Sequence, residues 1–161
     1  MNNSKLKIQN LTLIQLALID AVLLTAACLI PAASHLTQVR LFLFNPMVAL
    51  LLTGILLGRD WRNALVLAVM MPLVSNLLTG MPASPVCMIA QLATMAAVFG
   101  WLQRKWAVLP AVLVAIVASI AVYYALKVLT TGILFSPNSL TLNAASLLWG
   151  LLFALLYKRT R

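Results

Sequence analysis

The side chains best suited to chemistry in this sequence are its single histidine, His35, the serine before it, and Cys87. A serine or cysteine near a histidine could act as a nucleophile with its general base. Adjacent Ser34 and His35 do not hold their side chains in reacting geometry, and a catalytic histidine needs an acidic group to orient it. The only acids are Asp20, deep in an apolar run, and Asp60, in a gap on the other side. We therefore do not expect an enzyme.

Cys28 and Cys87 do not form a metal-binding or redox motif, and nothing in the sequence supports a disulfide between them. We expect Cys28 to pack as a small apolar residue inside a helix. Asp20 could pair with a basic residue or contact a partner protein. The chain has no Gly-x-x-x-x-Gly-Lys-Ser/Thr phosphate loop, so we expect no ATP hydrolysis by that route, and we expect no cofactor.

The elements that must position these residues are six long apolar runs. Each is about the length that crosses a ~30 Å hydrocarbon core as a helix. They are too continuously apolar for the ~10-residue alternating strands of a membrane barrel. Pro46 suits a first helical turn. Pro72 lies inside its run and should kink the helix, leaving a carbonyl for Ser75 or Asn76 to satisfy. The runs cover residues 11–33, 41–58, 64–80, 86–102, 107–127 and 139–157.

The basic residues fall in alternate gaps, which predicts the orientation of the runs. Nine of the eleven lie before the first run, in the second and fourth gaps, or after the sixth run. Because positive residues stay on the cytoplasmic side, we expect six transmembrane helices with both termini cytoplasmic. The other three gaps hold only Arg40 and Lys127. The nine are Lys5, Lys7, Arg59, Arg62, Arg104, Lys105, Lys158, Arg159 and Arg161.

Composition indicates the same class, an all-α integral membrane protein. Hydrophobic residues form 64% of the chain and charged residues 8%, which is too little polar surface for a soluble globule. The net charge of +9 does not indicate a nucleic-acid partner, because the charges are dispersed over four short segments and would meet anionic lipid. The first run resembles a signal peptide but is longer than a usual signal core, so we expect it to be retained. Residues 1–161 then form a single transmembrane domain.

The gaps predicted to face outward carry uncharged polar groups and turn formers, whereas the inner turns are tight and charged. Loops of the first kind can fold over the mouth of a pocket. Polar side chains just beneath them are costly in lipid and should face the bundle interior. They either line an outward-facing cavity or form hydrogen bonds between helices. These side chains belong to Asn45, Asn76, Gln91 and Asn143.

Small side chains recur at a spacing of four residues in two of the runs. Ala17, Ala21 and Thr25 form a stripe in the first run, and Gly54 and Gly58 form a pair in the second. Such a pattern lets another helix approach closely. The approaching helix could belong to the same bundle or to a separate membrane subunit.

Taken together, the chain resembles the substrate-binding S component of an energy-coupling factor (ECF) vitamin transporter. The resemblance rests on six helices in a small basic chain with both ends inside, and on the Ala17-xxx-Ala21 pattern. It rests also on the segment 45–58 and on the later segment 77–82, which ends in Gly-Met-Pro. In that family the alanine pattern docks the S component onto the transmembrane coupling subunit, and a related Gly-x-Pro turn opens the binding loop.

The resemblance implies a high-affinity binding subunit for a vitamin or related micronutrient, in the cytoplasmic membrane of a prokaryote. It would deliver its ligand by toppling in the membrane when a coupling subunit and a pair of ATPases engage it, with Ala17, Ala21 and Thr25 as the docking stripe. The family's pocket is lined by the outer halves of helices four to six and capped by outer loops. The corresponding positions here are His35, Arg40, Asn76, Met81, Cys87, Gln91, Tyr123, Lys127, Asn138, Asn143 and Trp149.

The resemblance also places His35 and Cys87 together over the pocket, which indicates a class of ligand. Imidazole and thiolate bind transition metals held in macrocycles, so a corrinoid or a haem with these axial ligands is the leading prediction. Arg40 and Lys127 could equally hold a carboxylate or phosphate of another vitamin. The alternative functions are an accessory membrane subunit without a ligand and, ranked last, an intramembrane enzyme.

Overall fold

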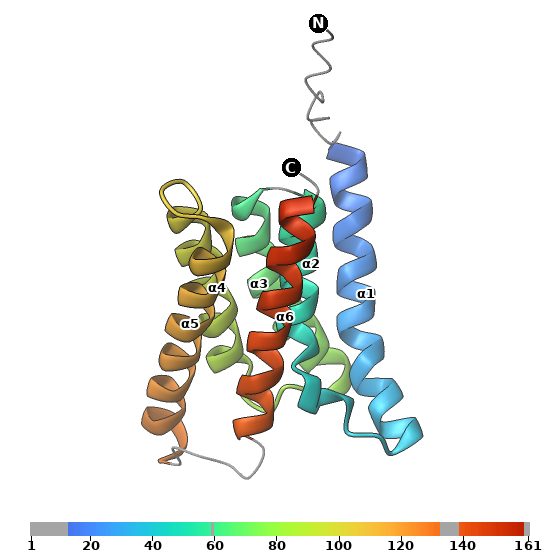
Figure 1. Cartoon of the computed structure of the whole chain (residues 1–161). Coiled ribbons are helices and arrows are strands. Elements are labelled where there is room, and N and C mark those ends of the chain that lie inside the picture. The colour runs from blue at the N-terminus through green and yellow to red at the C-terminus, as the bar shows by residue number, and fades with distance from the viewer. Residues whose placement is uncertain (1–12, 59, 133–138, 160–161) are drawn as a thin grey trace, which may run out of the picture.

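The computed structural model describes residues 13–58, 60–132 and 139–159, and within these ranges it is helical with no strand. Six α-helices run alternately up and down between the two ends of the bundle (Figure 1). Five of them are long and apolar enough to cross a membrane. The described residues therefore confirm an all-α fold of membrane-spanning character. The helices are α1 (Leu13–Thr37), α2 (Pro46–Gly58), α3 (Trp61–Thr79), α4 (Pro85–Leu102), α5 (Val108–Thr131) and α6 (Ser139–Arg159), with a 3-10 helix, η1 (Leu41–Phe44), before α2.

The expectation of one continuous helix over residues 41–58 is wrong, because the backbone breaks at Asn45. Asn45 adopts a left-handed φ of 46°, which asparagine tolerates better than most residues. Pro46 disfavours the helical conformation in the residue before it, so α2 begins at the proline and has 13 residues. The break is held from across the bundle, because the Asn45 Nδ2 donates to Ser146 Oγ at 2.8 Å.

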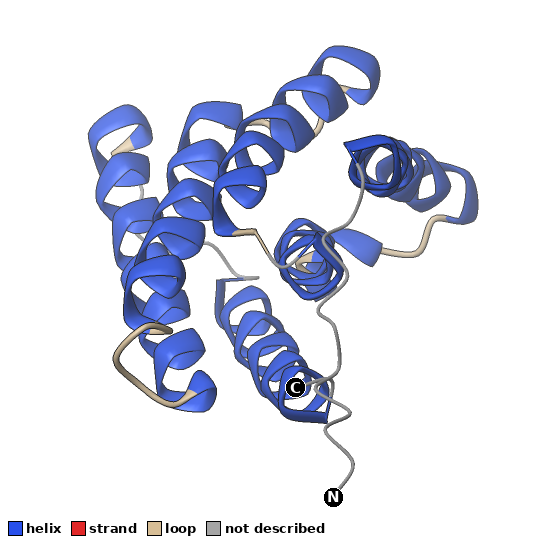
Figure 2. Ribbon diagram, turned by 90° about the horizontal axis from the view of Figure 1, so that it is seen from above, coloured by secondary structure: helices blue, strands red, loops and turns tan. Residues whose placement is uncertain are grey.

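The other helices are arranged around α2, which lies in the middle of the bundle (Figure 2). α2 packs on α1, α3, α4 and α6, while α4 also packs on α3 and α5, and α6 on α5. Towards the end where α4 stops, the core is aromatic. The Phe99 ring meets Phe153 edge-on at 5.3 Å between centroids and Tyr157 at 6.2 Å. These contacts join α4 to α6 and close the bundle at that end.

The glycine pair of α2 makes close contacts inside the bundle. A Cβ at Gly54 would lie 2.8 Å from the Leu67 side chain and 3.2 Å from that of Leu23, and one at Gly58 would lie 3.2 Å from Leu16. Larger side chains at these positions would require the leucine side chains of α1 and α3 to move. Of the two interpretations of this pair, packing within the bundle is therefore the one that the structure supports.

A serine on α3 compensates for a proline inside α1. Pro31 has no N–H to donate to the carbonyl of Ala27, one turn earlier in the helix. Ser75 Oγ donates to this carbonyl at 3.0 Å. The prediction that Ser75 or Asn76 would satisfy the carbonyl freed by Pro72 is thus wrong, since Ser75 bonds to α1 and Asn76 bonds to the loop after α3. A local sequence pattern could not reveal the partner, because it lies 48 residues away.

Removing this hydroxyl should destabilise the bundle. We expect Ser75→Ala to lower the free energy of unfolding by about 1–3 kcal/mol, because it leaves a buried carbonyl without a donor. Ser119→Ala is the matched control, since Ser119 is also buried but bonds to the Ile116 carbonyl of its own helix. The control should lose less stability than Ser75→Ala, because the Ile116 carbonyl keeps its backbone donor within the helix. Thermal unfolding in detergent measures both, and equal losses would contradict the role of Ser75.

Candidate functional site

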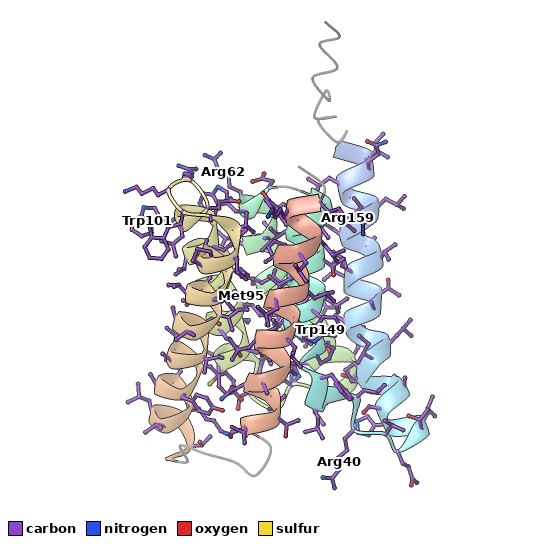
Figure 3. The ribbon with its side chains drawn as sticks, in the orientation of Figure 1. Arg40, Arg62, Met95, Trp101, Trp149 and Arg159 are labelled. Carbon is purple, nitrogen blue, oxygen red and sulfur yellow. The ribbon has the colours of Figure 1, made fainter. Side chains whose placement is uncertain are left out.

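More of the described basic residues lie at one end of the bundle than at the other (Figure 3). Arg62 and Arg159 lie at the end where α1 begins and α6 stops, which we call the basic end. Arg40 lies at the opposite end, which we call the Arg40 end. The separation agrees with the alternation of basic residues along the sequence, because successive helices run in opposite directions.

Both acids of the chain are engaged near the start of α3, towards the basic end. Asn63 Nδ2 donates to Asp20 Oδ1 at 2.8 Å, so the partner of Asp20 among the described residues is an amide. Asp60 caps α3 by accepting from the Arg62 N–H at 2.9 Å. No aspartate or glutamate side chain is therefore available at the Arg40 end, where the guanidinium of Arg40 is exposed.

A cavity of about 110 Å³ opens at the Arg40 end. It lies between the end of α1, the loop that follows it, the start of α2 and the loop between α3 and α4. It brings together His35, Arg40 and Met81, three of the residues predicted to bind a ligand. The remaining wall is formed by Ile30, Pro31, Ser34, Gln38, Val39 and Pro46.

Ser34 holds the loop that forms one wall of this cavity. Its Oγ donates to the Val39 carbonyl at 2.5 Å and accepts from the Leu41 N–H at 3.0 Å. Gln38, which lies between Ser34 and Val39 in the sequence, turns the chain with a left-handed φ of 57°. α1 extends beyond its predicted end at residue 33, so His35 lies on the last helical turn. The hydroxyl hydrogen of Ser34 goes to a backbone carbonyl, and its structural role is to clamp the loop.

The loop between α3 and α4 carries Met81 into the cavity and is held by several hydrogen bonds. Gly80 ends α3 in the left-handed conformation, φ 72°, and its N–H donates to the Asn76 carbonyl at 2.8 Å. The Asn76 side chain donates to the Pro82 carbonyl at 2.8 Å, and the Met81 N–H to Thr79 Oγ1 at 3.3 Å. Asn76 thus positions the loop, while Met81 supplies a soft apolar wall.

A second group of predicted ligand residues lies on α4 and α5 instead. Cys87 is buried, with its Sγ 3.8 Å from Thr130 Oγ1. The Lys127 ammonium lies 6.0 Å from the centroid of the Tyr123 ring, at the limit of a cation–π contact. Asn138, predicted to cap the same pocket, lies outside the described residues. The side chains of Cys87, Tyr123 and Lys127 do not line the 110 Å³ cavity.

The other polar residues that were expected to line a cavity either connect two helices or are buried. Asn143 Nδ2 donates to the Tyr124 hydroxyl at 3.2 Å, which links α6 to α5. Trp149 Nε1 donates to the Phe44 carbonyl at 2.7 Å and so holds η1 against α6. Gln91 is buried on α4. For Asn143, as for Asn45, hydrogen bonding between helices is the interpretation that the structure supports.

The structure does not bring His35 and Cys87 together. His35 is exposed at the end of α1, whereas the Cys87 side chain is 1% exposed on α4. These two helices do not contact each other among the described residues. The cavity beside His35 is also smaller than the roughly 300–1,000 Å³ of pockets that enclose drug-sized ligands. Axial ligation of one macrocycle by both side chains would require another arrangement.

The stripe of small residues on α1 faces away from the bundle. Ala17, Ala21 and Thr25 are all exposed, and Thr25 Oγ1 donates back to the Ala21 carbonyl at 2.8 Å. Within the 18-residue apolar window of α1 that is long enough to be a membrane span, only 11% is buried inside the structure. Packing of this stripe inside the bundle is thus excluded. Its polar hydroxyl is satisfied, so the face can meet lipid or another helix.

In the part of the chain that the structure describes, the fold is helical, with five helices of membrane-spanning length and a small cavity at one end. Comparisons with protein-family models, with curated proteins and with solved structures found no match. Sequence reasoning missed the loop clamp of Ser34 and the wall positions of Pro31 and Pro46. Pro31 lies inside α1 and Pro46 begins α2, so the two wall prolines come from the helices on either side of the loop.

Proposed function

We propose that this chain is a multi-pass subunit of the cytoplasmic membrane of a prokaryote that binds a small micronutrient for uptake, as the S components of ECF transporters do. The observation that carries the proposal is the cavity at the Arg40 end, where three residues predicted to bind a ligand converge. A separate coupling subunit and a pair of ATPases would supply the energy. The chain itself would bind and release the ligand and would catalyse no reaction.

The distribution of charge supports an orientation with six spans and both termini inside. The basic end would face the cytoplasm by the positive-inside rule, which places the cavity on the outer surface. α2 alone is only about 20 Å long. With η1 ahead of it, we expect the segment 41–58 to provide the sixth span, since α2 packs against four other helices.

The chemistry of the cavity favours a ligand with an acidic group attached to an apolar part. Arg40 offers a guanidinium that no aspartate or glutamate at this end neutralises, and guanidinium binds carboxylate or phosphate well. Met81 and Pro31 supply apolar walls. A corrinoid or haem remains a candidate, with His35 as the accessible axial ligand. Such a ring would extend beyond a cavity of about 110 Å³.

The test is to purify the whole protein and to identify any small molecule that accompanies it by mass spectrometry. We expect one compound in near-stoichiometric amount, and we expect Met81→Trp to lose it because the indole fills the cavity. Val117→Trp, on an exposed face of α5, should retain it. Absence of any compound, together with no binding from a panel of vitamins, would overturn the proposal.

The absorbance spectrum of the same preparation tests the macrocycle. If a corrinoid or haem is bound, His35→Ala should shift its visible bands, because the axial nitrogen is lost. Cys87→Ala should do so only if the thiol reaches the metal. Identical spectra for wild type and both variants would exclude axial ligation.

The exposed face of α1 supports a second candidate, an accessory membrane subunit without a ligand. A helix with so little burial would gain most from packing on another protein. The same mass spectrum separates the two functions. A clean protein that always co-purifies with a partner subunit would favour the accessory role.

A further inference from the structure

A shallow apolar groove between α2 and α6 is separate from the cavity at the Arg40 end. The groove has a volume of about 60 Å³ and is formed entirely by these two helices. On α2 it is lined at positions 49, 52, 53 and 56, and on α6 at positions 149, 152, 153 and 156. Both sets follow the i, i+3, i+4, i+7 spacing of one helical face. The two faces run side by side for about 10 Å.

The groove is suited to hydrocarbon. Its one hydroxyl, on Thr53, donates to the Ala49 carbonyl at 2.8 Å and so needs no partner from an occupant. Leu152 and Leu156 on its rim remain 45% and 42% exposed. A transmembrane helix is about 10 Å across and could not enter a space of this size. A single acyl chain could lie along it.

The two ends of the groove differ. Towards the Arg40 end it stops at Trp149, whose indole is fixed by its hydrogen bond to the Phe44 carbonyl. Towards the basic end the groove runs out at Leu156. Arg159, which lies at that end (Figure 3), comes seven residues after Leu152, so the two share one side of α6. Arg159 is exposed, and both acids of the chain are held at α3 by Asn63 and by the α3 N-terminus. The charge at the open end is therefore positive.

We propose that this groove is a binding site for one anionic phospholipid, with an acyl chain between α2 and α6 and the phosphate on Arg159. The helical faces set the direction of the chain, Trp149 limits its depth, and the guanidinium selects the head group. A basic residue beside a membrane surface attracts anionic lipid, and a guanidinium holds phosphate oxygens through paired hydrogen bonds. This site is independent of any role in transport.

The experiment measures lipid retention by the full-length protein with native mass spectrometry. Phosphatidylglycerol and phosphatidylcholine with identical acyl chains are added in equal amounts to the protein in detergent. We expect the wild type to retain one phosphatidylglycerol in preference to phosphatidylcholine. Arg159→Gln should reduce this preference about fivefold, the effect of one basic residue near the surface. Arg104→Gln, at the turn between α4 and α5, should leave it unchanged.

A second pair of variants tests the acyl chain. Thr53→Trp places a ring in the groove and should abolish tight retention of both lipids, whereas Val117→Trp on α5 should not. Equal loss in Arg159→Gln and Arg104→Gln would overturn the proposal, since general charge would then explain the preference. Unchanged retention by Thr53→Trp would also overturn it. A dimer of the chain that Thr53→Trp dissociates and that phosphatidylglycerol leaves intact would overturn it too, because the groove would then be an interface between two copies.

Discussion

In intact cells, a cysteine introduced by Ala83→Cys is expected to react with a membrane-impermeant thiol reagent, and one introduced by Lys105→Cys is expected not to. Both positions are exposed in turns between helices, Ala83 between α3 and α4 and Lys105 between α4 and α5. They lie at opposite ends of α4, so the bilayer would separate them. Because the basic turn should face the cytoplasm, the difference in labelling should be nearly all or none.

The background for this measurement has the native thiols replaced by Cys28→Ala and Cys87→Ala. Cys28 is partly buried and Cys87 is buried. Alanine is smaller than cysteine, so neither replacement overpacks the interior. Permeabilised cells provide the control, since both introduced cysteines should then react. Labelling of the Lys105→Cys variant alone in intact cells would reverse the proposed orientation, and the cavity at the Arg40 end would then face the cytoplasm.

Ala21→Trp is expected to reduce ligand uptake by about tenfold or more while leaving ligand binding to the purified protein unchanged. Ala21 is exposed in the middle of the small-residue stripe of α1. A stripe of this kind permits the close backbone approach that supports helix association in lipid. An indole would force the two helices apart, whereas the cavity at the other end of α1 would not be affected.

The control is Val117→Trp, which adds the same ring to an exposed face of α5. Uptake is measured in cells that contain the coupling subunit, and binding is measured with the ligand identified by mass spectrometry. Normal uptake by Ala21→Trp would contradict docking through this face. Loss of ligand binding in the purified variant would instead show that the stripe supports the cavity.

The sequence was sufficient for the helical class and for the approximate limits of most helices. Continuous apolar runs of this length leave the backbone no stable alternative in lipid, so the prediction needed no tertiary information. Pro46 lies in the first turn of α2, as predicted, and the error at residues 41–58 came from taking the whole run as one helix. The same proline also acts on the residue before it, and Asn45 could accept the left-handed backbone that results.

The sequence was a weaker guide to the candidate site. The structure brings His35, Arg40 and Met81 to one cavity, because the gaps that contain them come to the same end of an up-and-down bundle. Cys87 was wrongly expected beside His35, because a gap position does not specify which way a side chain turns. Burial against Thr130 depends on how α4 and α5 pack.

By itself, the sequence determined the helical class and the approximate extent of most helices, since these follow from hydrophobicity counted along the chain. The tertiary structure alone decided which polar groups satisfy each other. Ser75 serves a carbonyl freed by Pro31, and Asn45 bonds to Ser146 across 101 residues. Which polar groups face each other depends on the rotation of each helix about its axis. That rotation results from the fit of many side chains at once, which no single run encodes.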